Sequence, residues 1–126
     1  MVVLVVGRIN NILPQSFVDG PGNRSVVFFQ GCQFHCLYCH NPYTINICNA
    51  CGVCVECCPA GALRLGDGEI IWDSVRCVNC DTCIEVCPNH SSPKIKVQTA
   101  PTTWELLQTF IPFISGVTVS GGEPTC

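Results

Sequence analysis

Charged residues are scarce in this chain, and basic residues are especially few. Only 12% of the 126 residues are Asp, Glu, Lys or Arg, and six basic residues against nine acidic ones give a formal net charge of -3. Proteins that bind nucleic acid through its phosphates need clustered Lys and Arg. This balance therefore excludes an extended nucleic-acid-binding surface.

Long hydrophobic runs are also missing. The apolar stretch at residues 1–6 is too short for a membrane-spanning helix or for the core of a signal peptide, and no basic residue precedes it. We therefore expect no membrane association, no export and a cytoplasmic location. In a reducing cytoplasm the thirteen cysteines indicate metal ligation rather than disulfides.

Eleven of these cysteines fall into three groups. The first group is a CxxxCxxC motif, and the other two repeat one run, CxxCxxCxxxCP. The groups are Cys32, Cys36 and Cys39; Cys48, Cys51, Cys54 and Cys58; and Cys77, Cys80, Cys83 and Cys87. In two-cluster bacterial ferredoxins with such a repeat, the fourth cysteine of each run ligates the cluster of the other run. We therefore predict one 4Fe-4S cluster on Cys48, Cys51, Cys54 and Cys87, and another on Cys77, Cys80, Cys83 and Cys58.

The first group differs because three thiolates leave one of four irons open to a substrate. Zinc is the alternative metal for all three groups, although structural zinc sites usually use two separated CxxC pairs. The CxxxCxxC motif alone also fits a zinc half-site or unrelated cysteines. Cys57 does not fit the spacing, and we expect it to be a buried small residue. We expect His35, His40 and His90 to lie outside the ligand sets.

The cysteine repeat interrupts α/β sequence. Residues 1–45 and 91–126 are expected to form one α/β unit, and residues 46–90 an inserted ferredoxin-like α+β module. Six acidic and two basic residues between the first and last cysteines of the repeat suit a small electron-transfer module. Within it, residues 63–72 alternate around Asp67-Gly68, which predicts a β-hairpin whose Leu and Ile side covers the clusters.

The flanking unit shows a strand, a loop, a helix and a second strand. Residues 24–31 form an apolar run typical of a strand buried in a parallel sheet, and residues 117–120 predict a second strand. Between them, Thr102 and Glu105 form a capping-box pattern that predicts Thr102 as the N-cap of a helix, which Pro112 ends or kinks. The helix would bury an apolar stripe of Trp104, Leu107, Phe110, Ile111 and Ile114.

Such a unit needs further parallel strands to bury both of its faces. We therefore expect the chain to be the N-terminal part of a longer protein, truncated inside a partial (β/α) barrel. In such barrels the chemistry lies on loops at the carboxyl ends of the strands. The CxxxCxxC motif and the sequence Gly121-Gly122-Glu123-Pro124 each follow a predicted strand.

Taken together, these motifs resemble one family. Asp19-Gly20-Pro21-Gly22 is by itself most simply a turn. Followed by Arg24, by residues 32–39 with His40-Asn41-Pro42, by the two-cluster insert and by residues 121–124, it closely resembles the glycyl-radical enzyme activating enzymes. These are radical S-adenosylmethionine enzymes, and the likeness is to the subgroup with a ferredoxin-like insert. His35 departs from the arginine common there, at a position that does not ligate iron.

The resemblance implies a site and its cofactors. Cys32, Cys36 and Cys39 would hold a catalytic 4Fe-4S cluster whose fourth iron binds S-adenosylmethionine, making three clusters in all. Gly121, Gly122 and Glu123 would bind the methionine amino group, Tyr38 would lie against the adenine, and Asp19 would contact the target peptide.

The resemblance also implies an oxidoreductase reaction and its partners. Reductive cleavage would give methionine and a 5'-deoxyadenosyl radical, which abstracts hydrogen from a glycine of a partner glycyl-radical enzyme. The electron donor would be a flavodoxin or a ferredoxin. Two other classes stay open: a radical S-adenosylmethionine enzyme acting on a small molecule or another peptide, and a ferredoxin-type electron-transfer protein with extra sequence. A neighbouring gene for a glycyl-radical enzyme would distinguish them.

Overall fold

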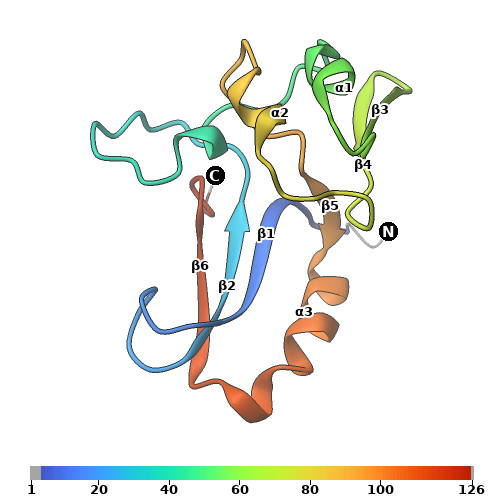
Figure 1. Ribbon diagram of the computed structural model, residues 1–126. Coiled ribbons are helices and arrows are strands. Elements are labelled where there is room, and N and C mark those ends of the chain that lie inside the picture. The colour runs from blue at the N-terminus through green and yellow to red at the C-terminus, as the bar shows by residue number, and fades with distance from the viewer. Residues whose placement is uncertain (1–3, 126) are drawn as a thin grey trace.

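The computed structural model describes residues 4–125, which form a mixed sheet with one main helix and a small lobe (Figure 1). The elements in chain order are β1 (Val6–Ser16), β2 (Arg24–Phe29), η1 (Pro42–Thr44), α1 (Val53–Cys57), β3 (Leu63–Gly66), β4 (Glu69–Trp72), α2 (Thr82–Glu85), β5 (Lys96–Thr99), α3 (Ala100–Gln108), η2 (Ile111–Phe113) and β6 (Gly116–Gly121). Within the described residues, every helix is too short or too polar to span a membrane.

The main sheet has the order β5-β1-β2-β6 and is mixed. Strand β2 pairs in parallel with β6, as the sequence predicts, but β1 pairs antiparallel with both β2 and β5. The expectation that β2 lies in a parallel sheet is therefore only partly met, because its other neighbour is antiparallel. The α/β class is confirmed. Neither β1 nor β5 was predicted, because β1 mixes apolar residues with Asn10, Asn11 and Pro14. An antiparallel edge on a parallel sheet is common in α/β folds. A complete barrel stays a prediction.

Helix α3 covers one face of this sheet. Leu107 on α3 packs with Ile9 of β1 and Val27 of β2, and Phe110 adds to the same core. The predicted N-cap is wrong by three residues: the Thr99 side chain accepts the Thr102 N–H at 3.2 Å. Pro101 explains the earlier start, since proline is favoured in the first turn.

The predicted apolar stripe of the helix is only partly buried. The helix stops at Gln108, and Pro112 lies in the separate 3-10 helix η2. Trp104 and Ile111, two members of that stripe, are therefore about half exposed rather than buried.

The small lobe contains the hairpin and two short helices. Strands β3 and β4 pair antiparallel, and Asp67 and Gly68 both have positive φ, as a tight hairpin turn requires. The hairpin prediction is confirmed. Leu63 lies buried with Cys54 of α1 and Cys83 of α2, and Ile70 and Trp72 pack against them. Ile71 is exposed, so only part of the predicted Leu and Ile side faces the cysteines.

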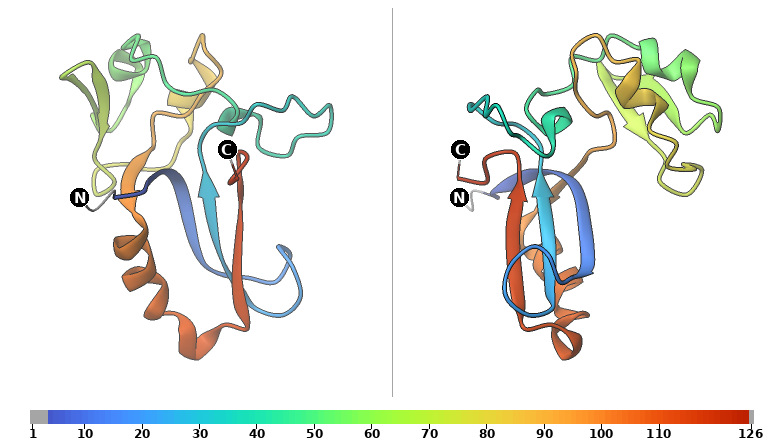
Figure 2. Two further views of the ribbon diagram at one scale, coloured as in Figure 1. Left: turned by 180° about the vertical axis from the view of Figure 1, so that it is seen from behind. Right: turned by 60° about the vertical axis from the view of Figure 1, so that its left-hand side comes forward.

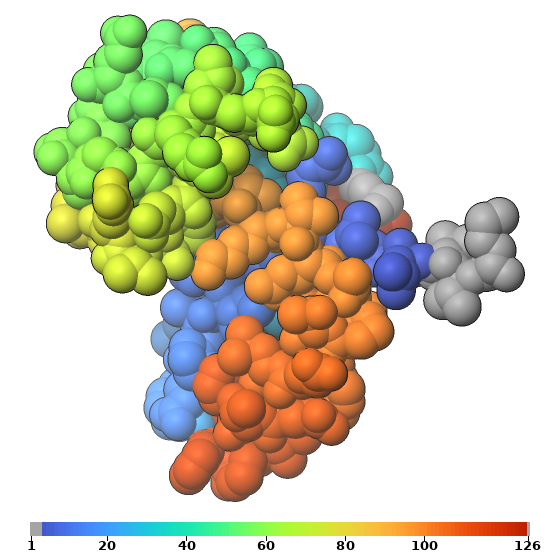
Figure 3. Space-filling view, turned by 90° about the vertical axis from the view of Figure 1, so that its right-hand side faces the viewer, coloured from blue at the N-terminus to red at the C-terminus, as the bar shows by residue number. Residues whose placement is uncertain are grey.

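A polar neck joins the lobe to the sheet. Gln30 is buried directly after β2, and its amide donates to the backbone carbonyls of Tyr43 and Asn46 at 2.7 Å each. The Asn46 side-chain amide donates to the Asn89 carbonyl, and the Asn89 side-chain amide donates to the Ile47 carbonyl. These two hydrogen bonds hold the two ends of the lobe together. In the side view of Figure 2 the lobe stands above the sheet, and in Figure 3 it lies above β5, with α3 extending downward on the opposite side of β5.

Candidate functional site

Two loops meet at the carboxyl edge of the sheet. Strands β2 and β6 are parallel neighbours, with Phe29 opposite Gly121, so the segments that follow them leave the sheet at the same edge. The Gly122 N–H donates to the Phe29 carbonyl at 2.7 Å, and the Glu123 N–H to the Gly31 carbonyl at 3.0 Å. The structure thus brings the CxxxCxxC loop and residues 121–124 together, as their positions after two strands predict.

The glycines of the second loop allow this close approach. A Cβ built on Gly122 would lie 2.0 Å from the Gly31 carbonyl oxygen, and one on Gly121 would lie 2.5 Å from the Phe29 nitrogen and oxygen. Gly121 also has φ of 93°, which other residues rarely adopt. Close backbone packing therefore explains why both positions are glycine, in addition to the ligand contacts predicted for them. Sequence reasoning missed Gly31 as the backbone neighbour of Gly122 and Phe29 as that of Gly121.

The CxxxCxxC loop projects from the sheet and is anchored at its base. The N–H groups of Gly31 and Cys32 donate to the carbonyls of Thr44 and Ile45 at 2.7 and 2.9 Å, which closes residues 32–43 into a loop. Cys32 and Cys39 are partly buried and Cys36 is exposed. Tyr38 is exposed, so its predicted contact with adenine stays a prediction. All three thiols are free and lie in an accessible loop, which fits a cluster that a substrate must reach.

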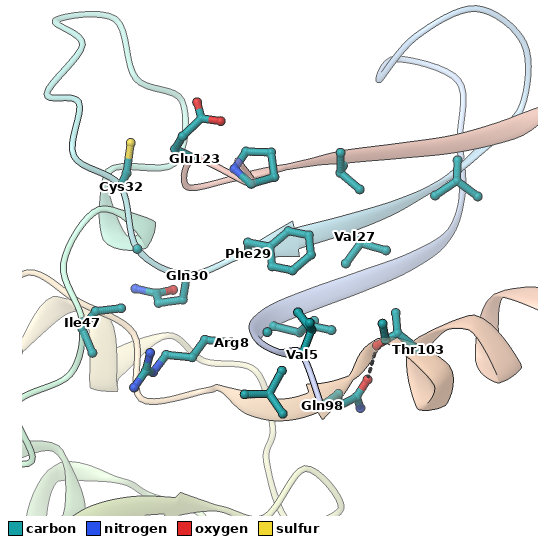
Figure 4. Close-up of a pocket in the computed structure, with 18 of the residues that line it drawn as sticks. Val5, Arg8, Val27, Phe29, Gln30, Cys32, Ile47, Gln98, Thr103 and Glu123 are labelled. Atoms are coloured by element: carbon teal, nitrogen blue, oxygen red, sulfur yellow. Dashed lines mark hydrogen bonds between the residues drawn. The ribbon is translucent and has the colours of Figure 1, made fainter. Parts of the chain in front are cut away.

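Glu123 stands beside Cys32 at the rim of a cavity of about 830 Å³ (Figure 4). The apolar floor of this cavity, with Val27 and Phe29, lies on the face of the sheet that α3 covers. The side chains of Cys32 and Glu123 both point away from that floor. We therefore place the candidate site on the outer side of this rim and not inside the cavity.

Glu123 is held as an anion. The hydroxyl and the N–H of Thr125 both donate to its Oε1, and they lower the pKa of the Glu123 carboxyl. A carboxylate fixed next to the loop of Cys32 can attract an ammonium group. Sequence reasoning missed Thr125 as the residue that orients it.

The Asp19-Gly20-Pro21-Gly22 loop lies at the other end of β2. Arg24 donates to the Val117 carbonyl and to the Thr118 hydroxyl at 2.7 Å each, and the Thr118 hydroxyl donates to the Asp19 carbonyl at 2.8 Å. The Asp19 carboxylate accepts a hydrogen bond from Ser16. These contacts give the loop a role in joining β2 to β6, and the contact of Asp19 with a target peptide stays a prediction.

The cysteines of the lobe gather around its hairpin. One small cavity is lined by Cys58 together with Cys77, Cys80 and Cys83, which is the grouping predicted for the second inserted cluster. Among residues 4–125, no three His, Cys, Asp or Glu side chains meet closely enough to hold a single metal ion. A four-iron cluster bonds each cysteine through a different iron, so it holds its ligands farther apart than one ion does. Cys57 is exposed, and the expectation that it is buried is wrong because it lies on the outer side of α1.

Burial and hydrogen bonds shift the pKa values of the thiols in the lobe in different directions. Burial, helped by Cys48, Cys83 and Cys51, raises the pKa of Cys54 to about 11, and burial also raises the pKa of Cys83. The Thr82 hydroxyl donates to Cys80 at 3.4 Å and lowers its pKa. At Cys87 burial acts to raise the pKa, but hydrogen bonds from Ser91 and its neighbours reverse the net direction.

An orphaned donor supports an inorganic group at this place. The Trp72 indole N–H is buried and has no hydrogen-bond partner among the described residues, and Trp72 borders the cavity of Cys58 and Cys77. Buried donors without acceptors are rare in native proteins and mark absent partners. Sulfide and thiolate sulfurs of a cluster are such acceptors, so the donor set fits a 4Fe-4S group.

Comparison with known proteins agrees with this geometry. Residues 47–91 match the family described as the 4Fe-4S dicluster domain. The isethionate sulfite-lyase activating enzyme of Desulfovibrio desulfuricans is 32% identical over 94% of this chain and 44% of that protein. The choline trimethylamine-lyase activating enzyme of Oleidesulfovibrio alaskensis is 34% identical over 90% of this chain and 42% of that protein.

A third relative, the 4-hydroxyphenylacetate decarboxylase activating enzyme of Clostridium scatologenes, is 34% identical over 94% of this chain and 44% of that protein. The chain is homologous to glycyl-radical enzyme activating enzymes. The resemblance that its motifs indicate is thereby confirmed. The chain spans less than half the length of these activating enzymes. Their names specify three different target enzymes.

Proposed function

We propose that the protein to which this chain belongs activates a glycyl-radical enzyme by radical S-adenosylmethionine chemistry. The observation that carries the proposal is the parallel pairing of β2 with β6, which places the Cys32 loop beside Gly122 and Glu123. The homology to activating enzymes supports the same function. The partner class is a glycyl-radical enzyme, and the electron donor is a flavodoxin or a ferredoxin.

The residues of this chain bind and orient the reacting groups. Cys32, Cys36 and Cys39 would hold a 4Fe-4S cluster. With S-adenosylmethionine bound, the cluster would supply the electron for reductive cleavage of the sulfonium. Glu123, kept anionic by Thr125, binds the ammonium of the methionine moiety. Gly121 and Gly122 let the backbone approach closely enough to contact the same ammonium. Tyr38 covers the adenine from its exposed position in the loop.

The lobe supplies two further clusters as relays or docking elements. Their ligands are Cys48, Cys51, Cys54 and Cys87 for one cluster, and Cys77, Cys80, Cys83 and Cys58 for the other. The domain division at residues 46–90 belongs to the same proposal. The bond from the Gln30 amide to the Asn46 carbonyl ties the lobe to the segment that leads from β2 into the Cys32 loop.

The whole protein, reduced and supplied with S-adenosylmethionine and its partner enzyme, is expected to give a glycine-centred doublet in electron paramagnetic resonance spectra. Matching amounts of 5'-deoxyadenosine should form. Omitting S-adenosylmethionine is the control. Cleavage without any labelled glycine would favour a small-molecule substrate, and electron transfer without cleavage would leave a ferredoxin-type protein.

Ligand crossing within the lobe gives a second expected result. Because Cys58 borders the cavity of Cys77, Cys80 and Cys83, Cys58→Ala and Cys80→Ala should perturb one cluster signal in electron paramagnetic resonance spectra. Cys87→Ala and Cys51→Ala should perturb the other signal. If Cys58→Ala instead disturbs the signal that Cys51→Ala disturbs, each run holds its own cluster and the crossing is wrong.

A further inference from the structure

Two side chains outside the cysteine groups border the second inserted site, and one of them, Trp72, also packs against Cys54 of the first. Trp72, from the end of β4, and Lys94, just before β5, line the cavity of Cys58, Cys77, Cys80 and Cys83. Neither belongs to a cysteine run, and the two residues are 22 positions apart. The hairpin and the return of the chain toward the sheet bring them together.

Trp72 offers a donor without an acceptor. Its indole ring packs against the buried group of Cys54, Leu63 and Cys83, and its N–H has no partner among residues 4–125. Leaving a buried donor unpaired costs about 1–3 kcal/mol. An acceptor sulfur in the adjoining cavity removes that cost.

Lys94 offers a poorly screened positive charge. Its side chain is 15% exposed, whereas that of its partner Asp81 is 57% exposed, with Nζ and Oδ1 2.5 Å apart. Water and salt therefore weaken the field of the carboxylate more than that of the ammonium. Lys94 and Asp81 both border the cavity of the cysteines, and the less exposed ammonium dominates the local field.

The other inserted site has different surroundings. Its charged neighbours are Arg8 and Glu69, which border the cavity at Cys48 and are both exposed. Cys87 lies 3.6 Å from the Ser91 hydroxyl, a neutral group. The two sites therefore share a sequence pattern but differ in how strongly solvent screens the charges beside them.

We propose that Trp72 and Lys94 make the cluster held by Cys77, Cys80 and Cys83 the more easily reduced of the two inserted clusters. Reduction adds one electron to the cluster, breaks no ligand bond and leaves one more negative charge. A neighbouring ammonium and an N–H donor to sulfur both favour that state, since net charge and hydrogen bonds set cluster potentials. The inference rests on the proposed function only in requiring 4Fe-4S clusters in the lobe.

The test is a dithionite titration of the anaerobically reconstituted full chain at controlled potentials, followed by electron paramagnetic resonance. The signal lost in Cys80→Ser identifies the cluster in question. Lys94→Met should disfavour its reduction about tenfold, equal to about 59 mV for one electron. Trp72→Phe should shift the potential in the same direction. The cluster of Cys48, Cys51 and Cys54 should change little in either variant.

Matched variants separate charge from packing. Lys94→Arg keeps the charge and should keep the wild-type potential. Lys96→Met removes an exposed ammonium that lies 5.4 Å from the Trp72 ring centroid, and it should shift the potential much less than Lys94→Met. If Lys94→Met prevents assembly of the cluster, the reduction potential of that cluster in Trp72→Phe protein alone tests the inference.

Unchanged potentials in fully loaded Lys94→Met and Trp72→Phe proteins would overturn the inference, as would equal shifts of both clusters. The iron content of the wild-type protein distinguishes a failure of the proposed function. Fewer than about eight irons in the lobe of wild-type protein would refute the two-cluster assignment itself.

Discussion

Replacing Cys32, Cys36 and Cys39 together by alanine is expected to remove about four of about twelve irons per reconstituted chain. The same change should abolish cleavage of S-adenosylmethionine by the whole protein. The eight cysteines of the lobe lie on the far side of the neck and keep their ligand sets. Iron analysis and chromatography of 5'-deoxyadenosine measure the two effects.

Cys57→Ala is the matched control for this loss. Cys57 is an exposed cysteine outside all three groups, so its replacement should leave both iron content and cleavage unchanged. Zinc in place of iron in the wild-type protein, or cleavage that survives the triple replacement, would contradict the assignment of the catalytic site.

A single methyl group at Gly122 is expected to have the second largest effect. The added Cβ would lie 2.0 Å from the Gly31 oxygen and 2.7 Å from its carbonyl carbon, and both are backbone atoms at the end of β2. The two loops must then separate. Overpacking of this kind typically costs 1–3 kcal/mol, occasionally more. Because the separation displaces Glu123 from Cys32, affinity for S-adenosylmethionine should fall at least about tenfold, which corresponds to about 1.4 kcal/mol.

Gly61→Ala separates backbone strain from this clash. Gly61 has φ of 59° but open space around its Cβ position, so alanine there should cost only about 1–2 kcal/mol of folding free energy. Its ligand affinity should match that of the wild type. Denaturant unfolding and equilibrium binding measure the two quantities. Wild-type affinity in Gly122→Ala protein would show that the loop contact with Gly31 does not position the site.

Local sequence chemistry predicted the elements closest to the candidate site. The apolar run before Cys32 and the run before Gly121 are the parallel strands β2 and β6. Asp67-Gly68 forms the hairpin turn, because few residue pairs adopt two positive φ angles in succession. The helix start was misplaced because Thr99 and Thr102 both suit an N-cap, and only the path of β5 into Pro101 selects Thr99.

The polar and charged contacts were not predictable in the same way. Gln30 looks like the polar end of an apolar strand, yet its amide bonds Tyr43 and Asn46, 13 and 16 residues away. Lys94 next to Cys83 likewise carries no spacing signal. Each depends on which segments pack together.

The sequence by itself determined the cysteine groups, the two parallel strands and the hairpin, because cluster ligation and tight turns require particular residue types at fixed short spacings. The tertiary structure alone decided that β1 and β5 complete a mixed sheet and that Gln30 joins the lobe to the sheet. It also decided that Trp72 and Lys94 both border the cavity of Cys58, Cys77, Cys80 and Cys83. These arrangements join residues far apart along the chain, and the packing of whole elements, which no short spacing encodes, sets their distances.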